Sequence, residues 1–137
     1  METYKFEVWV PIEPMSGTRG KRRYARKKEL IEAIREVKKD EMDAARNAFA
    51  NKLVKISVRF YLQKPTEGRS DTSGKKDLDN MLKLVLDSLQ PKADTQGKLD
   101  GLGLISNDNN VYRLEAVKRI VDRPEQVGLR LTVSEFH

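Results

Sequence analysis

Residues 52–62, KLVKISVRFYL, place an apolar side chain at every second position. A repeat of two puts these side chains on one face of a β-strand and the polar ones on the other. Residues 24–50, which come just before, contain no glycine or proline, and their apolar residues recur every three or four positions. That spacing predicts one long amphipathic helix. The change of period within a few residues therefore indicates a helix followed by a strand.

The rest of the chain repeats these two patterns. Residues 3–10, 111–121 and 127–136 have the alternation of strands, and residues 75–89 have the spacing of a second helix. The predicted order is β-α-β-α-β-β, which is an α+β fold with helices packed on one mixed sheet. A chain of 137 residues fits one domain, so we expect residues 1–137 to form a single unit.

The amino-acid composition limits which residues could form a catalytic or metal-binding site. The chain has no cysteine, and its one histidine is the last residue, His137. Disulfides, zinc–thiolate sites and cysteine nucleophiles are excluded, and a histidine-based site is not expected. Catalysis would have to use carboxylates, lysines, hydroxyls or a hard metal ion, and we expect no organic cofactor. The sequence has neither a transmembrane run nor a signal peptide, so we expect a cytoplasmic protein without a membrane partner.

The second predicted helix begins with two acids, in the stretch KKDLDNMLKLVLDSL at residues 75–89. Asp77 and Asp79 stand where a loop enters the helix, and Asp79 and Lys83 share one helical face because they are four residues apart. One interpretation is an ordinary helix start, since acids favour the N-terminal end of a helix. The other is a Mg²⁺ site, since that ion prefers carboxylate oxygens. Both interpretations stay open on these residues alone.

A third acid from elsewhere in the chain would complete such a site, and we expect it to converge with Asp77 and Asp79 on one point of the fold. The best candidate is Asp108, in the polar turn ISNDNNV between two apolar stretches at residues 105–111. The alternative for Asp108 is a turn in which its side chain bonds the nearby backbone.

The positive charge of the chain is concentrated in one segment. The formal net charge is +6, and residues 19–28, RGKRRYARKK, hold seven basic residues and no acid. Because a helix N-terminus disfavours cations, a phosphate partner would explain this cluster better than solvation does. The candidate DNA contacts are Arg19, Lys21, Arg22, Arg23, Arg26, Lys27, Lys28, Lys75 and Lys76.

The two acidic blocks together resemble the RusA-type Holliday junction resolvases. Asp77, Leu78, Asp79, Asn80, Lys83 and Asp87 match the first block of that family, and Asp108 and Val111 match the second. The resemblance implies an endonuclease that makes paired nicks in four-way DNA junctions, acting as a homodimer with Mg²⁺ or Mn²⁺. It implies that Asp77, Asp79 and Asp108 are metal ligands and that Lys83 has an essential basic role. Asn107 and Asn110 differ from the residues that the family usually has at these positions. The three proposed metal ligands are present.

Two other functions fit the same residues. In a non-catalytic nucleic-acid-binding module, the acids would be helix caps and the basic segment would do the binding. In a metal nuclease of another structure specificity, the acids would act on a different DNA substrate. A test of divalent-metal dependence separates the first from an enzyme, and a panel of DNA substrates separates the second.

Overall fold

The computed structural model describes residues 4–14, 21–64, 78–91 and 101–137, except for the side chains of residues 21–24. The elements are β1 (Lys5–Val10), α1 (Lys21–Lys38), α2 (Met42–Phe49), β2 (Val54–Gln63), α3 (Leu78–Leu89), β3 (Val111–Val121) and β4 (Gly128–Glu135). Two short 3-10 turns, η1 (Asp108–Asn110) and η2 (Pro124–Gln126), precede β3 and β4. The predicted α+β fold and the order of its elements are confirmed, with one difference in the first helical stretch.

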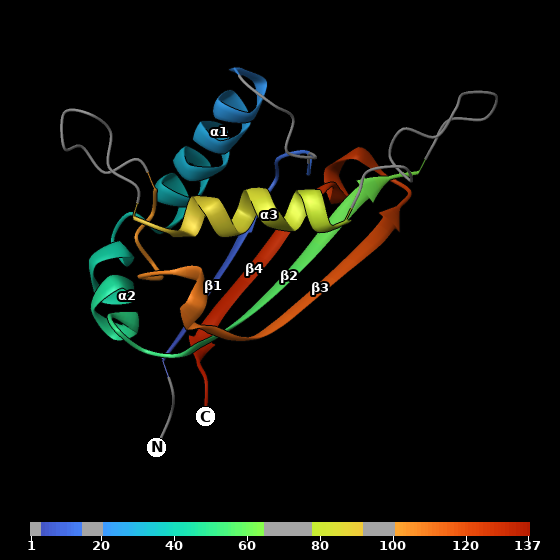
Figure 1. Cartoon of the computed structure of the whole chain (residues 1–137). Coiled ribbons are helices and arrows are strands. Elements are labelled where there is room, and N and C mark those ends of the chain that lie inside the picture. The colour runs from blue at the N-terminus through green and yellow to red at the C-terminus, as the bar shows by residue number, and fades with distance from the viewer. Residues whose placement is uncertain (1–3, 15–20, 65–77, 92–100) are drawn as a thin grey trace.

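The four strands form one mixed sheet in the order β1-β4-β2-β3. β4 lies between β1 and β2 and is antiparallel to both, whereas β3 runs parallel to β2 at the edge of the sheet. Parallel neighbours need a crossover connection, and α3 lies within it. α3 therefore runs back over the sheet from the end of β2 toward the start of β3 (Figure 1).

The helices pack on one face of the sheet, and the other face is open (Figure 1). Burying each large apolar side chain in this layer contributes roughly 1.5–3 kcal/mol. The alternating residues of β2 supply the centre of the core, and none of them is more than 1% exposed. They are Val54, Ile56, Val58, Phe60 and Leu62.

The prediction of one helix over residues 24–50 is wrong, because a turn divides this stretch into α1 and α2. In the turn, the Glu41 N–H donates to the Lys38 carbonyl at 2.9 Å, and the Lys38 ammonium pairs with the Glu41 carboxylate at 3.2 Å. The turn starts a second helix whose own apolar face, including Phe49, is buried in the core. Neither glycine nor proline marks the break, so the spacing of apolar residues does not reveal it.

Tyr4 ties the first strand to this turn. Its hydroxyl donates to Glu41 Oε1 at 2.7 Å, and its ring contacts the Phe49 ring edge-on at 5.5 Å between centroids. Burial, and then the hydrogen bond to Glu41, raise the pKa of Tyr4 to about 12. The same hydrogen bond holds the pKa of Glu41 below its ordinary value.

Tyr4→Phe should therefore destabilise the protein in a pH-dependent way. The variant keeps the ring but loses a hydrogen bond to a carboxylate, so the free energy of unfolding at neutral pH should fall by about 1–2 kcal/mol. Because the pKa of Glu41 is lowered, its contribution is present above the ordinary carboxyl pKa of 4.5 and is lost as the pH falls through the folded-state pKa. Because the pKa of Tyr4 is raised, its contribution is present below pH 10.0 and is lost as the pH rises toward about 12.

Urea unfolding of both proteins in acidic, neutral and alkaline buffers checks this prediction. The difference in stability between wild type and Tyr4→Phe should be largest at neutral pH and should shrink on both sides. A difference that stays constant with pH would contradict the assigned role of the hydrogen bond.

Among the residues that the structure describes, none of the helices combines the length and the apolar character needed to cross a lipid bilayer.

Candidate functional site

The N-terminal half of α3 carries two of the predicted site residues. Asp79 lies in the first turn of the helix and is exposed, and Lys83 follows one turn later, also exposed. An acid in the first turn interacts favourably with the helix dipole, which helps the helix to begin there. The opposite side of α3 is anchored in the core, and this orients Asp79 and Lys83 outward. The buried residues of α3 are Met81, Leu84, Val85, Ser88 and Leu89.

Asp108 lies in η1, immediately before β3, with its side chain exposed. The Asn107 side chain caps this turn by accepting a hydrogen bond from the Asn109 N–H at 2.9 Å. The Asn110 side-chain amide donates to the Lys52 carbonyl at 3.0 Å. These two hydrogen bonds hold the turn that contains Asp108 at the end of the sheet where β2 starts.

The segment that precedes η1 is hydrogen-bonded to the C-terminal end of α3. The Leu102 N–H donates to the Ser88 carbonyl at 2.8 Å, and the Ile105 N–H donates to the Leu89 carbonyl at 3.2 Å. Two arginines hold the same segment from the other helices. Arg35 donates to the Gly101 carbonyl at 3.0 Å, and Arg46 donates to the Leu102 carbonyl at 2.8 Å.

The first turn of α3 and the η1 turn consequently lie toward opposite ends of α3 (Figure 1). Asp79 belongs to the first of these turns and Asp108 to the second. Asp79 precedes Leu89 by ten residues, which corresponds to about 15 Å along a helix axis. The described residues contain no group of three or more acidic, histidine or cysteine side chains that could hold a metal ion. Asp77 falls outside the described residues, so its place in the site stays a prediction. A single chain does not bring Asp79 to Asp108.

The predicted basic contacts fall into three groups. Arg19, Lys75 and Lys76 lie outside the described residues, and Lys21, Arg22 and Arg23 form the first turn of α1 without described side chains. Of the remaining three, Lys28 is exposed, Arg26 is half-buried, and Lys27 is only 8% exposed. Lys27 therefore turns toward the protein interior and is a poor candidate for a phosphate contact.

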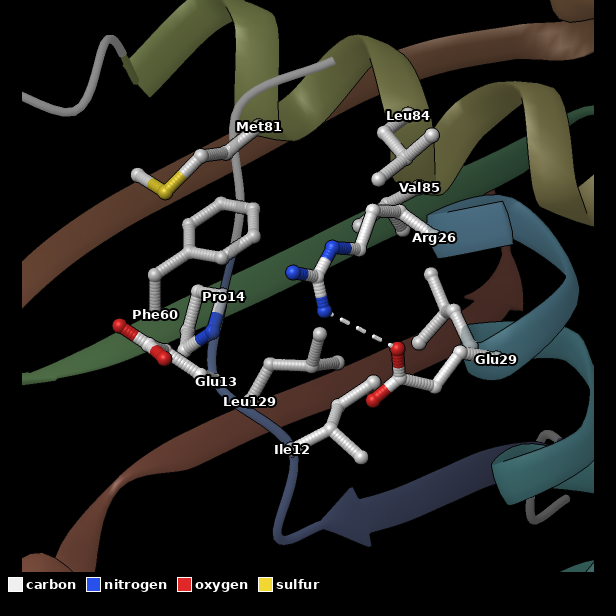
Figure 2. A pocket seen from close by; sticks show the side chains of 11 residues that line it. Ile12, Glu13, Pro14, Arg26, Glu29, Phe60, Met81, Leu84, Val85 and Leu129 are labelled. Atoms are coloured by element: carbon white, nitrogen blue, oxygen red, sulfur yellow. Dashed lines mark hydrogen bonds and ion pairs between the residues drawn. The ribbon is translucent and has the colours of Figure 1, made fainter. Parts of the chain in front are cut away.

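Arg26 borders a mostly apolar pocket between α1 and α3. The Arg26 guanidinium pairs with the Glu29 carboxylate at 3.2 Å across the mouth of this pocket (Figure 2). Its floor and walls include Phe60, Met81 and Leu129. Asp79, Lys83 and Asp108 do not line the pocket, so it is separate from the acidic residues.

The open face of the sheet is a basic surface that sequence reasoning missed. The strand register places six cations and two carboxylates there, and none of them was among the predicted DNA contacts. One carboxylate, Glu7, pairs with Arg130 at 3.0 Å, and the other, Glu115, pairs with Arg113 at 2.9 Å. The remaining positive charge favours a polyanion. The cations are Lys5, Lys55, Arg59, Arg113, Arg119 and Arg130.

Comparison with protein families shows to which family the chain belongs. The family model described as endodeoxyribonuclease RusA matches residues 11–132, almost the whole chain. The chain belongs to the RusA family. RusA proteins are endodeoxyribonucleases that act on Holliday junction DNA in recombination. The match spans Asp77, Asp79, Lys83 and Asp108 in a RusA context. A search of curated proteins found no match.

The carboxylate oxygens of the acidic residues are of the type that binds a hard divalent cation. Carboxylates at an accessible helix start and at an accessible turn are the ligands that Mg²⁺ and Mn²⁺ take in proteins. Of the described carboxylates, however, Asp79 lies at the start of α3 and Asp108 lies in the turn beyond its other end, so these two do not meet within one chain.

Proposed function

We propose that the protein resolves four-way DNA junctions as a homodimer that depends on Mg²⁺, with Mn²⁺ as a substitute. The observation that carries the proposal is the exposure of Asp79 and Lys83 on the N-terminal half of α3, in a chain of the RusA family. A four-way junction has near two-fold symmetry and needs two opposed nicks. A symmetric dimer with two sites meets that requirement.

Because Asp79 and Asp108 lie apart within one chain, the dimer would also serve to complete the metal site. We propose that each metal site combines Asp77 and Asp79 of one chain with Asp108 of the partner subunit. A two-fold axis beside α3, level with the middle of the helix, would set the α3 helices of the two copies antiparallel, and each end of one helix would then lie level with the opposite end of the other. Two identical sites would result, each with three carboxylates.

The bound cation would supply an activated water and would neutralise charge on the phosphodiester. The protein's own groups have distinct tasks around it. The three carboxylates would bind the cation through oxygen, and the exposure of Asp79 and Asp108 leaves room for a DNA strand. Lys83, one turn beyond Asp79, would offer an ammonium to a phosphate oxygen.

Incubation with synthetic DNA tests the proposal. A four-way junction and a linear duplex of matched sequence are each treated with the protein in Mg²⁺ or in EDTA. We expect two symmetric nicks in the junction with Mg²⁺, and no nicks in EDTA or in the duplex. Binding without nicking under every condition would indicate a non-catalytic module, and nicking of the duplex at a similar rate would indicate another substrate specificity.

The basic start of α1 should contact the DNA backbone. Neutralising Arg22, Arg23 and Lys28 together, each to glutamine, should weaken junction binding and flatten its salt dependence. Removing one phosphate interaction should reduce the slope of log affinity against log salt by roughly 0.9. Lys39→Gln, just beyond the opposite end of α1, is the matched control and should leave the slope unchanged. An unchanged slope in the triple variant would mean that this segment does not contact DNA.

A further inference from the structure

The outer edge of β3 has no strand beside it among the residues that the structure describes. β3 is the outermost strand of the sheet and, among the described residues, pairs only with β2 (Figure 1). It is also the longest strand, with 11 residues. The free N–H and C=O groups of such an edge are a template for another strand, and proteins that keep a long edge exposed risk uncontrolled association.

The exposed apolar side chains of the protein gather on this strand. Six large hydrophobic residues are exposed among those described, and four of them belong to β3: Tyr112, Leu114, Val117 and Ile120. Leu114 is 42% exposed although its neighbour on β2, Ile56, is fully buried in the same row of the sheet. The helices cover β2 and leave β3 at the margin. An edge strand that also presents apolar side chains suits a protein partner.

We propose that β3 is the subunit interface, with the β3 strands of two copies paired antiparallel around a two-fold axis through Val117. The inference rests on the proposed function, which requires two copies of the chain. A two-fold axis perpendicular to a sheet relates its edge strands antiparallel, and it places the same surface of both copies in contact. The two four-stranded sheets would then form one continuous sheet.

The side chains of β3 are self-complementary in this register. With Val117 opposite its own counterpart, Leu114 lies opposite Ile120 of the partner subunit, and Glu115 lies opposite Arg119 of the partner subunit. The symmetry repeats the apolar pair and the ion pair on the other side of the axis. Directly opposed pairs of both kinds stabilise antiparallel strands.

The neighbouring register is worse. An axis through Ala116 would set Arg113 opposite Arg119 of the partner subunit, and directly opposed like charges destabilise a strand pair. It would also set Leu114 against Lys118 of the partner subunit. Of these two registers, the charges on β3 favour the axis at Val117.

This arrangement also agrees with the proposed metal site. β3 begins beside Asp108 and ends beside the end of β2, where the Lys64 N–H donates to the Val121 carbonyl at 2.7 Å. α3, with Asp79 in its first turn, follows β2 in the chain. Antiparallel pairing of two β3 strands brings the turn that holds Asp108 of the partner subunit toward this end.

Oxidative cross-linking of a single-cysteine variant tests the interface. The chain has no cysteine of its own, so Val117→Cys introduces the only thiol. Opposed residues of an antiparallel pair have Cα atoms about 4.5–5.5 Å apart, which is within the range of a disulfide. We expect mild oxidation to convert most of the full-length variant to a disulfide-linked dimer.

Ile120→Cys is the matched control on the same strand. Ile120 is more exposed than Val117, at 48% against 37%, so collisions would cross-link it more readily. In the proposed register its counterpart lies roughly 20 Å away along the paired strands. Ile120→Cys should therefore stay monomeric on a non-reducing gel. Failure of Val117→Cys to cross-link, or equal cross-linking of both variants, would overturn the interface.

Junction nicking by the wild type and by reduced Val117→Cys separates this inference from the proposed function. Nicking without specific cross-linking would reject the β3 interface while the nuclease function stands. Specific cross-linking without nicking would retain the interface and reject the nuclease function.

Discussion

Asp79→Asn should lower the rate of junction nicking by roughly 100-fold or more, since loss of even an indirect partner of a catalytic metal costs about 10–100-fold. The substitution keeps the size of the side chain and removes one negative charge from the proposed metal site. Junction binding should persist or become tighter, because an anion close to the phosphates is removed. If Asp79 served only to start α3, the cost would be limited to about 0.3–1 kcal/mol of stability and nicking would continue.

Gel shifts in Ca²⁺ and nicking assays in Mg²⁺ measure the two effects separately. Asp43→Asn is a matched control, because Asp43 is also an exposed acid in the first turn of a helix, α2. It should lose no nicking activity. An Asp79→Asn protein that nicks junctions at close to the wild-type rate would refute the catalytic role of this carboxylate.

Gly101→Ala should be the most destabilising small substitution in the segment that positions Asp108. A Cβ atom on buried Gly101 would overlap the carbonyl oxygen of Gln90, and backbone cannot move aside as a side chain can. The same residue's carbonyl accepts the hydrogen bond from Arg35. We expect a loss of about 3 kcal/mol in the free energy of unfolding, the upper part of the range for overpacked sites.

Thermal unfolding should show this loss as a fall of roughly 10 °C in Tm. Asn109→Ala is the control from η1, because its exposed side chain should be replaceable within about 0.5 kcal/mol. A Gly101→Ala protein as stable as wild type would mean that the segment from residue 101 is not packed against the end of α3 as described.

The fold could be predicted from the sequence wherever the spacing of apolar residues determines which side chains are buried. The alternation of residues 54–62 places every second side chain under the helices, and the structure has the same residues in the core. The break between α1 and α2 was not predictable, because it depends on Lys38, Glu41 and distant Tyr4 instead of a glycine or proline. Spacing also does not show which strand lies at the edge, so the exposure of Leu114 and Ile120 required the sheet order.

The candidate site was predictable in part for the same reason. Sequence places Asp79 and Lys83 on one face of a helix start and Asp108 in a turn before a strand, and both placements agree with the structure. The separation of Asp79 from Asp108 follows from the path of the chain along α3, which no local pattern contains. The burial of Lys27 and the basic open face of the sheet likewise depend on how distant elements pack.

Mixing two inactive variants tests most directly whether the nuclease site is shared between two chains. Asp79→Asn and Asp108→Asn proteins should each fail to nick a junction in Mg²⁺. After subunit exchange in an equal mixture, a mixed dimer would have one site that lacks both acids and one that keeps both. About a quarter of all sites would then be intact, since half of the dimers are mixed and each has one intact site of two. We expect nicking to return in the mixture, as single nicks in one strand of the junction. A mixture as inactive as its two components would contradict a shared site.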